Sequence, residues 1–239
     1  MGSGQHDRIG YRNVQSYTVG DNIIGKSAPI GDWSDGGGSG SYTCKVAAGQ
    51  VLECIDDTTA EYYWPKLTFD TDGHVNDIIS FEYKSSSLLG GQVFIYGDGG
   101  GLYLQLPHFD GTGNVMAYNN AVTQVDTHQD ITAGAWYTWW IKFTGTNTFR
   151  IVVTAGQGVA EPDWDTVHDH QARVAIVNHV QGFGCVGVGN STMTTTIDNI
   201  KPKWTYVAGA SKLKYCSGGT TFAAKTLKYY NGATWVAVS

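Results

Sequence analysis

Two stretches of the chain carry side chains that could act on a sugar. The first is an acidic run, Glu161, Asp163 and Asp165, interleaved with Pro162 and Trp164. Two neighbouring carboxylates can serve as acid and nucleophile in glycoside hydrolysis. Pro162 disfavours a regular central strand here, and no base or orienting residue can be placed beside these acids from sequence alone. Solvated acids in a loop are therefore the simpler interpretation.

The second stretch, residues 136–154, places aromatic and cationic side chains together. Side chains alternate along a strand, so Trp136, Trp140 and Lys142 share one face, and Arg150 joins them from the next strand. Aromatic rings can stack on sugars while polar groups fix their orientation. With Trp164 from the following loop, the predicted carbohydrate site is Trp136, Trp140, Lys142, Arg150 and Trp164. The alternative is that these tryptophans pack in the core or in an interface, because tryptophan is mostly buried.

The same stretch predicts a β-hairpin with a defined register. Both arms are rich in aromatic and β-branched residues, which favour strands. A loop of residues 145–147 opposes only apolar residues on one face, whereas a loop one residue longer would mix the faces. The predicted pairs on that face are Phe143 with Phe149, Ile141 with Ile151, and Trp139 with Val153. On the other face Lys142 opposes Arg150, which favours exposure to water, carboxylates or an anionic partner.

Composition indicates an all-β protein. The 239 residues include 32 glycines, 5 prolines and 13% aromatic residues, and long amphipathic helical patterns are absent. Many short strands joined by glycine-containing turns are typical of a sandwich or barrel. The net charge of −6 argues against nucleic-acid binding. No stretch approaches the roughly 18 apolar residues of a membrane span, so we expect no membrane insertion.

Further strands are expected on both sides of the hairpin. Residues 29–42 are expected to form a loop because of their glycine density. Residues 70–77 superficially resemble a calcium loop but lack its downstream glutamate. Cys44 and Cys54 can face each other across a hairpin, and a cytoplasmic origin favours free thiols there. The expected strands are 41–46, 51–56, 62–69, 78–84, 92–96, 102–106, 114–118, 121–125, 173–178, 184–189 and 193–200.

Three segments carry a resemblance to a known family. The Trp-rich strand 136–143, the Phe-Arg-Ile-Val strand 149–154 and the closing Ile-Asp-Asn-Ile of 197–200 resemble concanavalin A-like, laminin-G-like jelly-roll domains. The resemblance covers about residues 18–206 and implies an antiparallel jelly-roll β-sandwich. It also implies a structural calcium at Asp198, with Asp21 or Asp32 as a candidate second ligand. The Glu-x-Asp-x-x-Glu strand of the family's β-glucanases has no match, so catalysis is not expected.

The composition changes after Trp204. A small-residue linker at 207–211 precedes two related units that begin Leu213-Lys-Tyr and Leu227-Lys-Tyr. Asn231-Gly232 is a strong hairpin signal. The ending Lys-Tyr-Tyr-Asn-Gly-Ala-Thr-Trp-Val resembles short C-terminal β-modules of phage virion proteins. Two such hairpins are too small for a stable core of their own, so we expect them to dock on the sandwich, on each other across subunits, or on a larger partner.

These observations predict three parts: an N-terminal arm for anchoring or assembly (1–20), a jelly-roll lectin-like sandwich (21–206) and a tandem hairpin module (207–239). We expect a non-enzymatic bacteriophage virion surface protein, a head decoration or a tail or fibre component, with a carbohydrate-binding domain. Its expected partners are its own copies, other virion proteins and a host surface glycan. Met1–Arg8 lacks a signal-peptide pattern, so synthesis in the host cytoplasm is expected. The alternatives are a carbohydrate-binding module of a glycan-degrading protein and a glycoside hydrolase or lyase.

Overall fold

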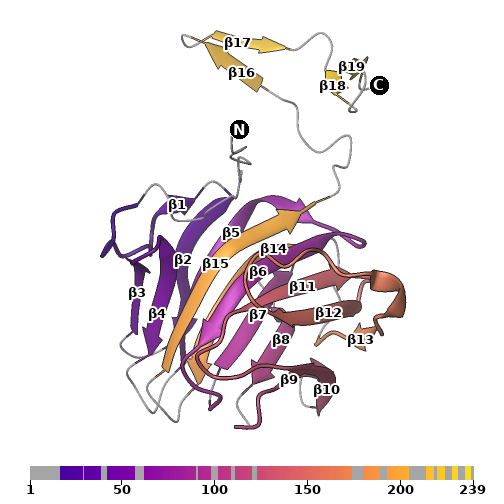
Figure 1. Cartoon of the computed structure of the whole chain (residues 1–239). Helices are drawn as coiled ribbons and strands as arrows, with labels where there is room; N and C mark the ends of the chain where they lie inside the picture. Colours follow the sequence, from indigo (N-terminus) through magenta and orange to yellow (C-terminus); the bar gives the residue numbers. More distant parts are fainter. Residues whose placement is uncertain are drawn as a thin grey trace, which may run out of the picture. The chain divides into compact units, whose positions relative to one another are not determined.

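The computed structural model confirms an all-β chain (Figure 1). It divides into two compact units, Met1–Trp204 and Thr205–Ser239. Among the described residues, no helix is long and apolar enough to cross a membrane. The structure describes residues 17–28, 30–38, 42–56, 62–89, 91–97, 102–108, 111–119, 123–173, 180–188, 193–204, 214–217, 220–223, 228–230 and 235–237.

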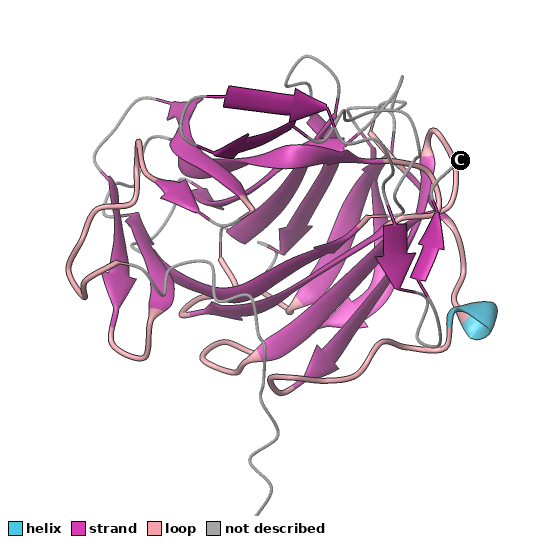
Figure 2. Cartoon of the chain, turned by 90° about the horizontal axis from the view of Figure 1, so that it is seen from above, coloured by secondary structure: helices cyan, strands magenta, loops and turns pink. Residues whose placement is uncertain are grey.

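The first unit is a sandwich of two antiparallel sheets, which Figure 2 shows as facing layers. The front sheet has seven strands, in the order β13 (His170–Gln171), β12 (Thr148–Ala155), β11 (Tyr137–Phe143), β6 (Ile78–Ser85), β15 (Met193–Lys203), β4 (Val51–Asp56) and β3 (Tyr42–Ala47). The back sheet has six, in the order β1 (Ser27–Ala28), β2 (Gly31–Gly38), β5 (Tyr62–Gly73), β14 (Val180–Val188), β7 (Gly91–Gly97) and β8 (Leu102–His108).

Three further hairpins complete the described strands. One pairs β9 (Asn114–Asn119) with β10 (Thr123–Asp130). The second unit contains the two hairpins that the sequence predicts, each as a separate two-stranded sheet. These pair β16 (Lys214–Ser217) with β17 (Thr220–Ala223), and β18 (Lys228–Tyr230) with β19 (Trp235–Ala237).

The predicted register of the central hairpin is confirmed. Strands β11 and β12 pair Phe143 with Phe149 and Ile141 with Ile151, and all four side chains are fully buried. On the other face Lys142 opposes Arg150. The alternation of apolar and polar residues thus assigns one face of the hairpin to the core and leaves the other outside the sandwich.

Aromatic side chains fill the space between the sheets. The Trp139 ring stacks on Phe81 with centroids 5.5 Å apart and meets Tyr83 at 5.4 Å. The Phe143 ring lies 5.8 Å from that of Tyr103, which comes from the back sheet. Such pairs add packing energy beyond the burial of apolar area, so this layer joins the two sheets.

The expectation of a loop over residues 29–42 is wrong for the part that the structure describes. Residues 31–38 form strand β2, and Trp33 from this strand is buried in the core. Gly31 lies so close to β5 that a Cβ atom would collide with the carbonyl oxygen of Thr68. Glycine therefore serves strand packing here, and the pairing with β5 overrides its preference for loops.

Two other expectations change. Strand β5 continues to Gly73, through the first half of the segment that resembles a calcium loop. Cys44 and Cys54 are directly opposite in the β3–β4 hairpin and form a disulfide, so the expectation of free thiols is wrong. The arm 1–16, most of the strand expected at 173–178, and the Asn231-Gly232 turn lie outside the described residues.

Candidate functional site

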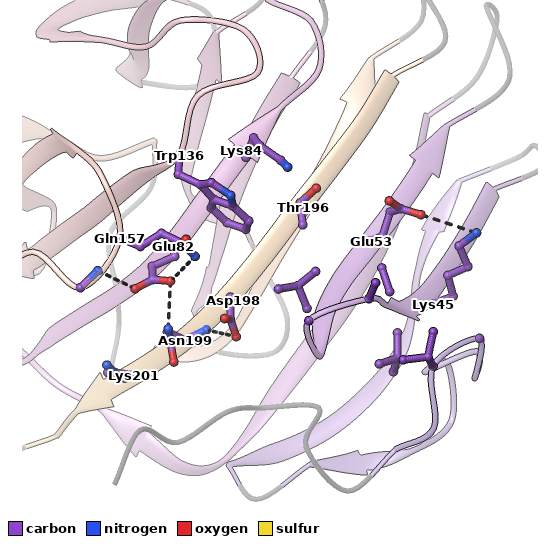
Figure 3. Close-up of a pocket in the computed structure, with 18 residues that line it drawn as sticks. Lys45, Glu53, Glu82, Lys84, Trp136, Gln157, Thr196, Asp198, Asn199 and Lys201 are labelled. Carbon is purple, nitrogen blue, oxygen red and sulfur yellow. Dashed lines mark hydrogen bonds and ion pairs between the residues drawn. The ribbon is translucent and has the colours of Figure 1, made fainter. Parts of the chain in front are cut away.

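The outer face of the front sheet is hollowed into a groove of about 1120 Å³. The loop residues Gln157 and Gly158 form one wall, and the turn 47–49 with residues 19–20 forms the other. Figure 3 shows the floor, which is mostly polar. Its labelled side chains are Lys45, Glu53, Glu82, Lys84, Trp136, Gln157, Thr196, Asp198, Asn199 and Lys201.

Strand alternation explains why polar side chains gather on this floor. In β6, Phe81 and Tyr83 face the core, so the intervening Glu82 and the following Lys84 face the groove. The register then places Asp198 of β15 directly opposite Glu82. Two carboxylate-bearing residues are thus paired on the groove floor.

A β-bulge adds one more polar residue to this floor. The β6–β15 register steps by two residues, from Glu82 to Ser80, while β15 advances by three, from Asp198 to Lys201. The extra residue is Asn199, which has a φ angle of 50°. Asparagine tolerates this left-handed conformation better than most residues do. Asp198, Asn199 and Lys201 therefore all line the groove.

Glu82 holds the loop wall onto the sheet. Its side chain is almost fully buried, with 3% exposed. Gln157 Nε2 and Asn199 Nδ2 each donate to Oε2 at 2.9 Å, and the Gly158 backbone N–H donates to Oε1 at 2.7 Å. Both carboxylate oxygens are committed to protein donors, which is the condition for burying such a group.

Trp136 brings an aromatic ring to the same groove. The ammonium group of Lys84 lies 5.0 Å from the centroid of this ring, a cation–π contact. At the far end of the floor, Lys45 Nζ and Glu53 Oε1 form a 3.5 Å ion pair. The groove therefore combines one partly exposed aromatic ring with charged groups of both signs.

The other predicted sugar-site residues form a different cluster. Arg150 donates through Nη1 to the backbone oxygen of Trp164 at 2.5 Å and through Nε to Asp169 at 2.9 Å. Lys142 Nζ lies 5.8 Å from the Trp164 ring centroid. Trp164 is buried, so it anchors the loop on the sheet. We call Lys142, Arg150, Trp164 and Asp169 the loop anchor. The hydrogen bonds from Arg150 and Thr144 lower the pKa of the Asp169 carboxyl.

The acidic run in this loop also has structural partners. Glu161 accepts from Trp164 Nε1 at 2.9 Å and forms a 2.7 Å ion pair with Lys203, and the hydrogen bond from Lys203 lowers the Glu161 pKa. Asp163 caps a 3-10 helix at Trp164–Thr166 by accepting from the Asp165 N–H. Glu161 and Asp163 therefore help to shape the loop.

Trp140 is not among the residues that line the groove. It lines a smaller pocket of about 160 Å³ between the loop residues 158–161 and the front sheet. We call this the loop pocket. It shares Glu82, Gly158, Asn199 and Lys201 with the groove. Of the five predicted sugar-site residues, the structure thus brings Trp136 to the groove, Trp140 to the loop pocket, and the other three to the loop anchor.

The two predicted calcium ligands lie on different sheets. Asp32 is on β2 of the back sheet, and Asp198 is on β15 of the front sheet. Asp21, the other candidate, pairs with Lys26 at 3.0 Å. Across the described ranges, no group of three or more histidine, cysteine, aspartate or glutamate residues could hold a metal ion.

Sequence reasoning missed Glu82, Lys84, Asn199 and Lys201. A glutamate inside the segment 78–83, which is otherwise apolar or aromatic except for Ser80, was a detectable signal, since a charged residue in a half-buried strand must face a polar surface. Its partners could not be found this way, because Gln157 and Asn199 are 75 and 117 residues away.

No family model and no curated protein matches the chain by sequence. Among solved structures, it resembles a sialidase with a TM-score of 0.54 at 10% identity, over 72% of this chain and 17% of the sialidase. Other similar structures are a β-1,3-glucanase from Mycobacterium marinum (TM-score 0.45, 14% identity, 78% of this chain and all of that one) and a galectin from the sponge Cinachyrella (0.41, 15%, 59% and 99%). The sialidase likeness supports the predicted jelly-roll-like sandwich.

Proposed function

We propose that this chain binds carbohydrate without cleaving it, in the groove of the front sheet, and that it does so on the surface of a bacteriophage particle. The observation that carries the binding proposal is the groove itself: the Trp136 ring beside a floor of carboxylate, amide and ammonium groups. An aromatic surface with a few oriented polar groups suits a sugar, which has an apolar ring face and a rim of hydroxyls.

Binding without hydrolysis is favoured by the hydrogen bonds that Glu82 accepts within the protein. A hydrolase remains the second candidate, because Glu82 and Asp198 are directly opposite across β6 and β15. Retaining glycosidases use two such neighbouring carboxylates. Here both oxygens of Glu82 are occupied by protein donors, and Asp198 accepts from the Asn199 N–H at 2.8 Å. Glu82 thus serves the architecture of the groove instead of facing a scissile bond.

Glycan binding is tested by a glycan array followed by calorimetry on any ligand found. Replacing Trp136 with alanine is expected to weaken binding by about 10-fold or more, because a central aromatic contact is lost. Tyr118 of β9 is the control, since its ring is also partly exposed and it does not line the groove. Unchanged binding by Trp136→Ala, or an equal loss in Tyr118→Ala, would refute this site.

Hydrolysis is tested on the same ligand by mass spectrometry after prolonged incubation. We expect the glycan to be recovered intact. Appearance of shortened products that disappear in Asp198→Asn would instead establish the second candidate, a glycosidase.

The particle role rests on the C-terminal repeats, whose ending resembles phage β-modules. The test is incorporation into particles after removal of residues 205–239, the second compact unit. We expect the truncated protein to keep its sandwich and to be absent from purified particles. Normal incorporation would refute the anchoring role of this unit.

A further inference from the structure

Five residues of the groove form one row across the front sheet. The strand register pairs Lys84 of β6 with Thr196 of β15. Glu53 of β4 is opposite Thr196 on one side and opposite Lys45 of β3 on the other. Trp136 extends the row beyond Lys84, since its ring centroid lies 5.0 Å from the Lys84 ammonium group. All five residues line the groove, and Figure 3 shows them one after another across the strands. We call them the cross-strand row.

The cross-strand row defines the long dimension of the groove. From Trp136, which precedes β11, to Lys45 on β3 it crosses four inter-strand steps, which correspond to roughly 19 Å. On β6, β4 and β3 the lining residues extend over only two steps along the strand, roughly 7 Å. A ligand that follows the long dimension therefore crosses the strands, and a single sugar ring covers less than half of the row.

The end of the row at Lys45 offers the same two kinds of contact as the end at Trp136. A small aliphatic surface lines the groove beside the Lys45–Glu53 ion pair. Its members are Val19, Ala47 and Val51. The ion pair has a length of 3.5 Å, and an ammonium group has three donors and a carboxylate several lone pairs, so both groups can still bind hydroxyls. This end therefore suits a second sugar, distant from the one at Trp136.

The charges on the groove lining balance. The lining contains three cationic and three anionic side chains. These are Lys45, Lys84, Lys201, Glu53, Glu82 and Asp198. A charged ligand therefore gains no net attraction from the lining as a whole. Hydroxyl groups both donate and accept, so a neutral sugar can use ammonium and carboxylate partners alike.

We propose that the cross-strand row binds a neutral, linear oligosaccharide of about four sugars, laid across the strands. One terminal sugar of the bound stretch stacks on Trp136, and the other contacts Lys45 and Glu53. This inference rests on the proposed carbohydrate binding and adds the charge and length of the ligand. It also assigns Lys45 and Glu53 to ligand binding at the opposite end of the row from the aromatic ring.

The experiment measures affinity against ligand length by calorimetry on the full chain. The probes are neutral linear oligosaccharides of glucose, mannose and N-acetylglucosamine, from the disaccharide to the hexasaccharide. Oligogalacturonates and chitosan oligomers of the same lengths supply the anionic and cationic comparisons. For at least one neutral series we expect affinity to rise by about 10-fold or more up to the tetrasaccharide and then to level off. The preferred neutral ligand should bind almost equally at low and high salt.

Variants at the two ends of the row separate the two contacts. Lys45→Ala is expected to weaken binding of the tetrasaccharide by about 3- to 10-fold, as for the loss of a hydrogen bond, and to leave the disaccharide unchanged. Trp136→Ala should weaken every length. Lys26→Ala is the matched control, because Lys26 is also a half-exposed lysine ion-paired with an acid, and it does not line the groove.

Several results would overturn this inference and leave the proposed function intact. These are equal affinity for the disaccharide and the hexasaccharide, an equal loss at all lengths in Lys45→Ala, and a loss in Lys26→Ala as large as that in Lys45→Ala. Tighter binding of a charged series, or failure of every neutral series while the glycan array shows binding, would overturn the ligand class in the same way. Absence of binding to every probe and every arrayed glycan would refute the proposed function itself.

Discussion

The two faces of the β11–β12 hairpin make opposite uses of similar residues. On the inner face, Trp139 is completely buried against Phe81 and Tyr83. On the outer face, Trp136 and Trp140 line a groove and a pocket and remain partly exposed. The difference shows that a tryptophan-rich strand gives no information on function until its faces are separated, since the inner ring serves stability and the outer rings are available to a ligand.

The largest test of this comparison removes one inner ring. Phe143→Ala is expected to lower the free energy of unfolding by about 3–5 kcal/mol, because it leaves a cavity in a layer contacted by both sheets. Chemical denaturation followed by tryptophan fluorescence measures this. A loss below about 1 kcal/mol would contradict the assignment of this face to the core.

The next test concerns Glu82, an outer-face residue of the neighbouring strand β6 that also holds structure together. Glu82→Gln is expected to lower the free energy of unfolding by about 1.5–3 kcal/mol, because three protein donors lose an ionised acceptor. Hydrogen exchange of the Gly158 amide should accelerate, since this amide donates to Glu82 Oε1. Glu53→Gln is the control and should change stability by about 0–1 kcal/mol, as its ion pair with Lys45 is partly exposed. Equal effects of the two changes would mean that Glu82 does not hold the loop.

A smaller effect is expected from pH at the loop anchor. The pKa of Asp169 is lowered from its ordinary value of 3.8, chiefly by the hydrogen bond from Arg150. The folded state therefore favours the ionised form, so the stabilisation is present above the ordinary pKa and is lost as pH falls through the lowered one. Thermal unfolding between about pH 5 and about pH 2 should show a shallower decline for Asp169→Asn than for the parent. If the two proteins lose thermal stability in parallel as pH falls, Asp169 makes no such pH-dependent contribution.

The smallest change is expected from Lys142, the neighbour of Phe143 on the opposite face. Lys142→Ala loses a cation–π contact with Trp164 and also relieves the repulsion from Arg150 directly opposite. These effects offset each other, so stability should stay within about 0.5 kcal/mol of the parent. Measured beside Phe143→Ala, it gives the contrast between adjacent positions on one strand. A loss comparable to that of Phe143→Ala would show that both faces are core.

The hairpin register could be predicted because a three-residue loop pairs apolar inner residues with one another, whereas a loop one residue longer would mix the faces. Strand β2 could not, because the glycines that suggest a loop are required by the close approach of Gly31 to Thr68, a contact between distant segments. The burial of Trp164 was hidden for the same reason. Its backbone oxygen accepts from Arg150 of strand β12, which is 14 residues away in the sequence.

For the candidate site, sequence supplied the aromatic residues and missed the polar floor. Strand alternation places Trp136 outside the core from local sequence alone. The grouping of Glu82 with Gln157 and Asn199 depends on which strands are neighbours, and local pattern does not fix that order. The role of Asn199 also depends on a register shift, which is a property of two strands together.

That register shift makes Asn199 a removable part of the molecule. Because it is the one surplus residue opposite β6, deleting it would leave Ile200 directed to the core and Lys201 to the outside, as both are now. Deleting Ile200 instead would bring a polar amide to the interior. One polar residue can therefore be removed from this face by a deletion without changing which of the following side chains point to the core. A deletion in a regularly alternating part of the strand would reverse the direction of every residue after it.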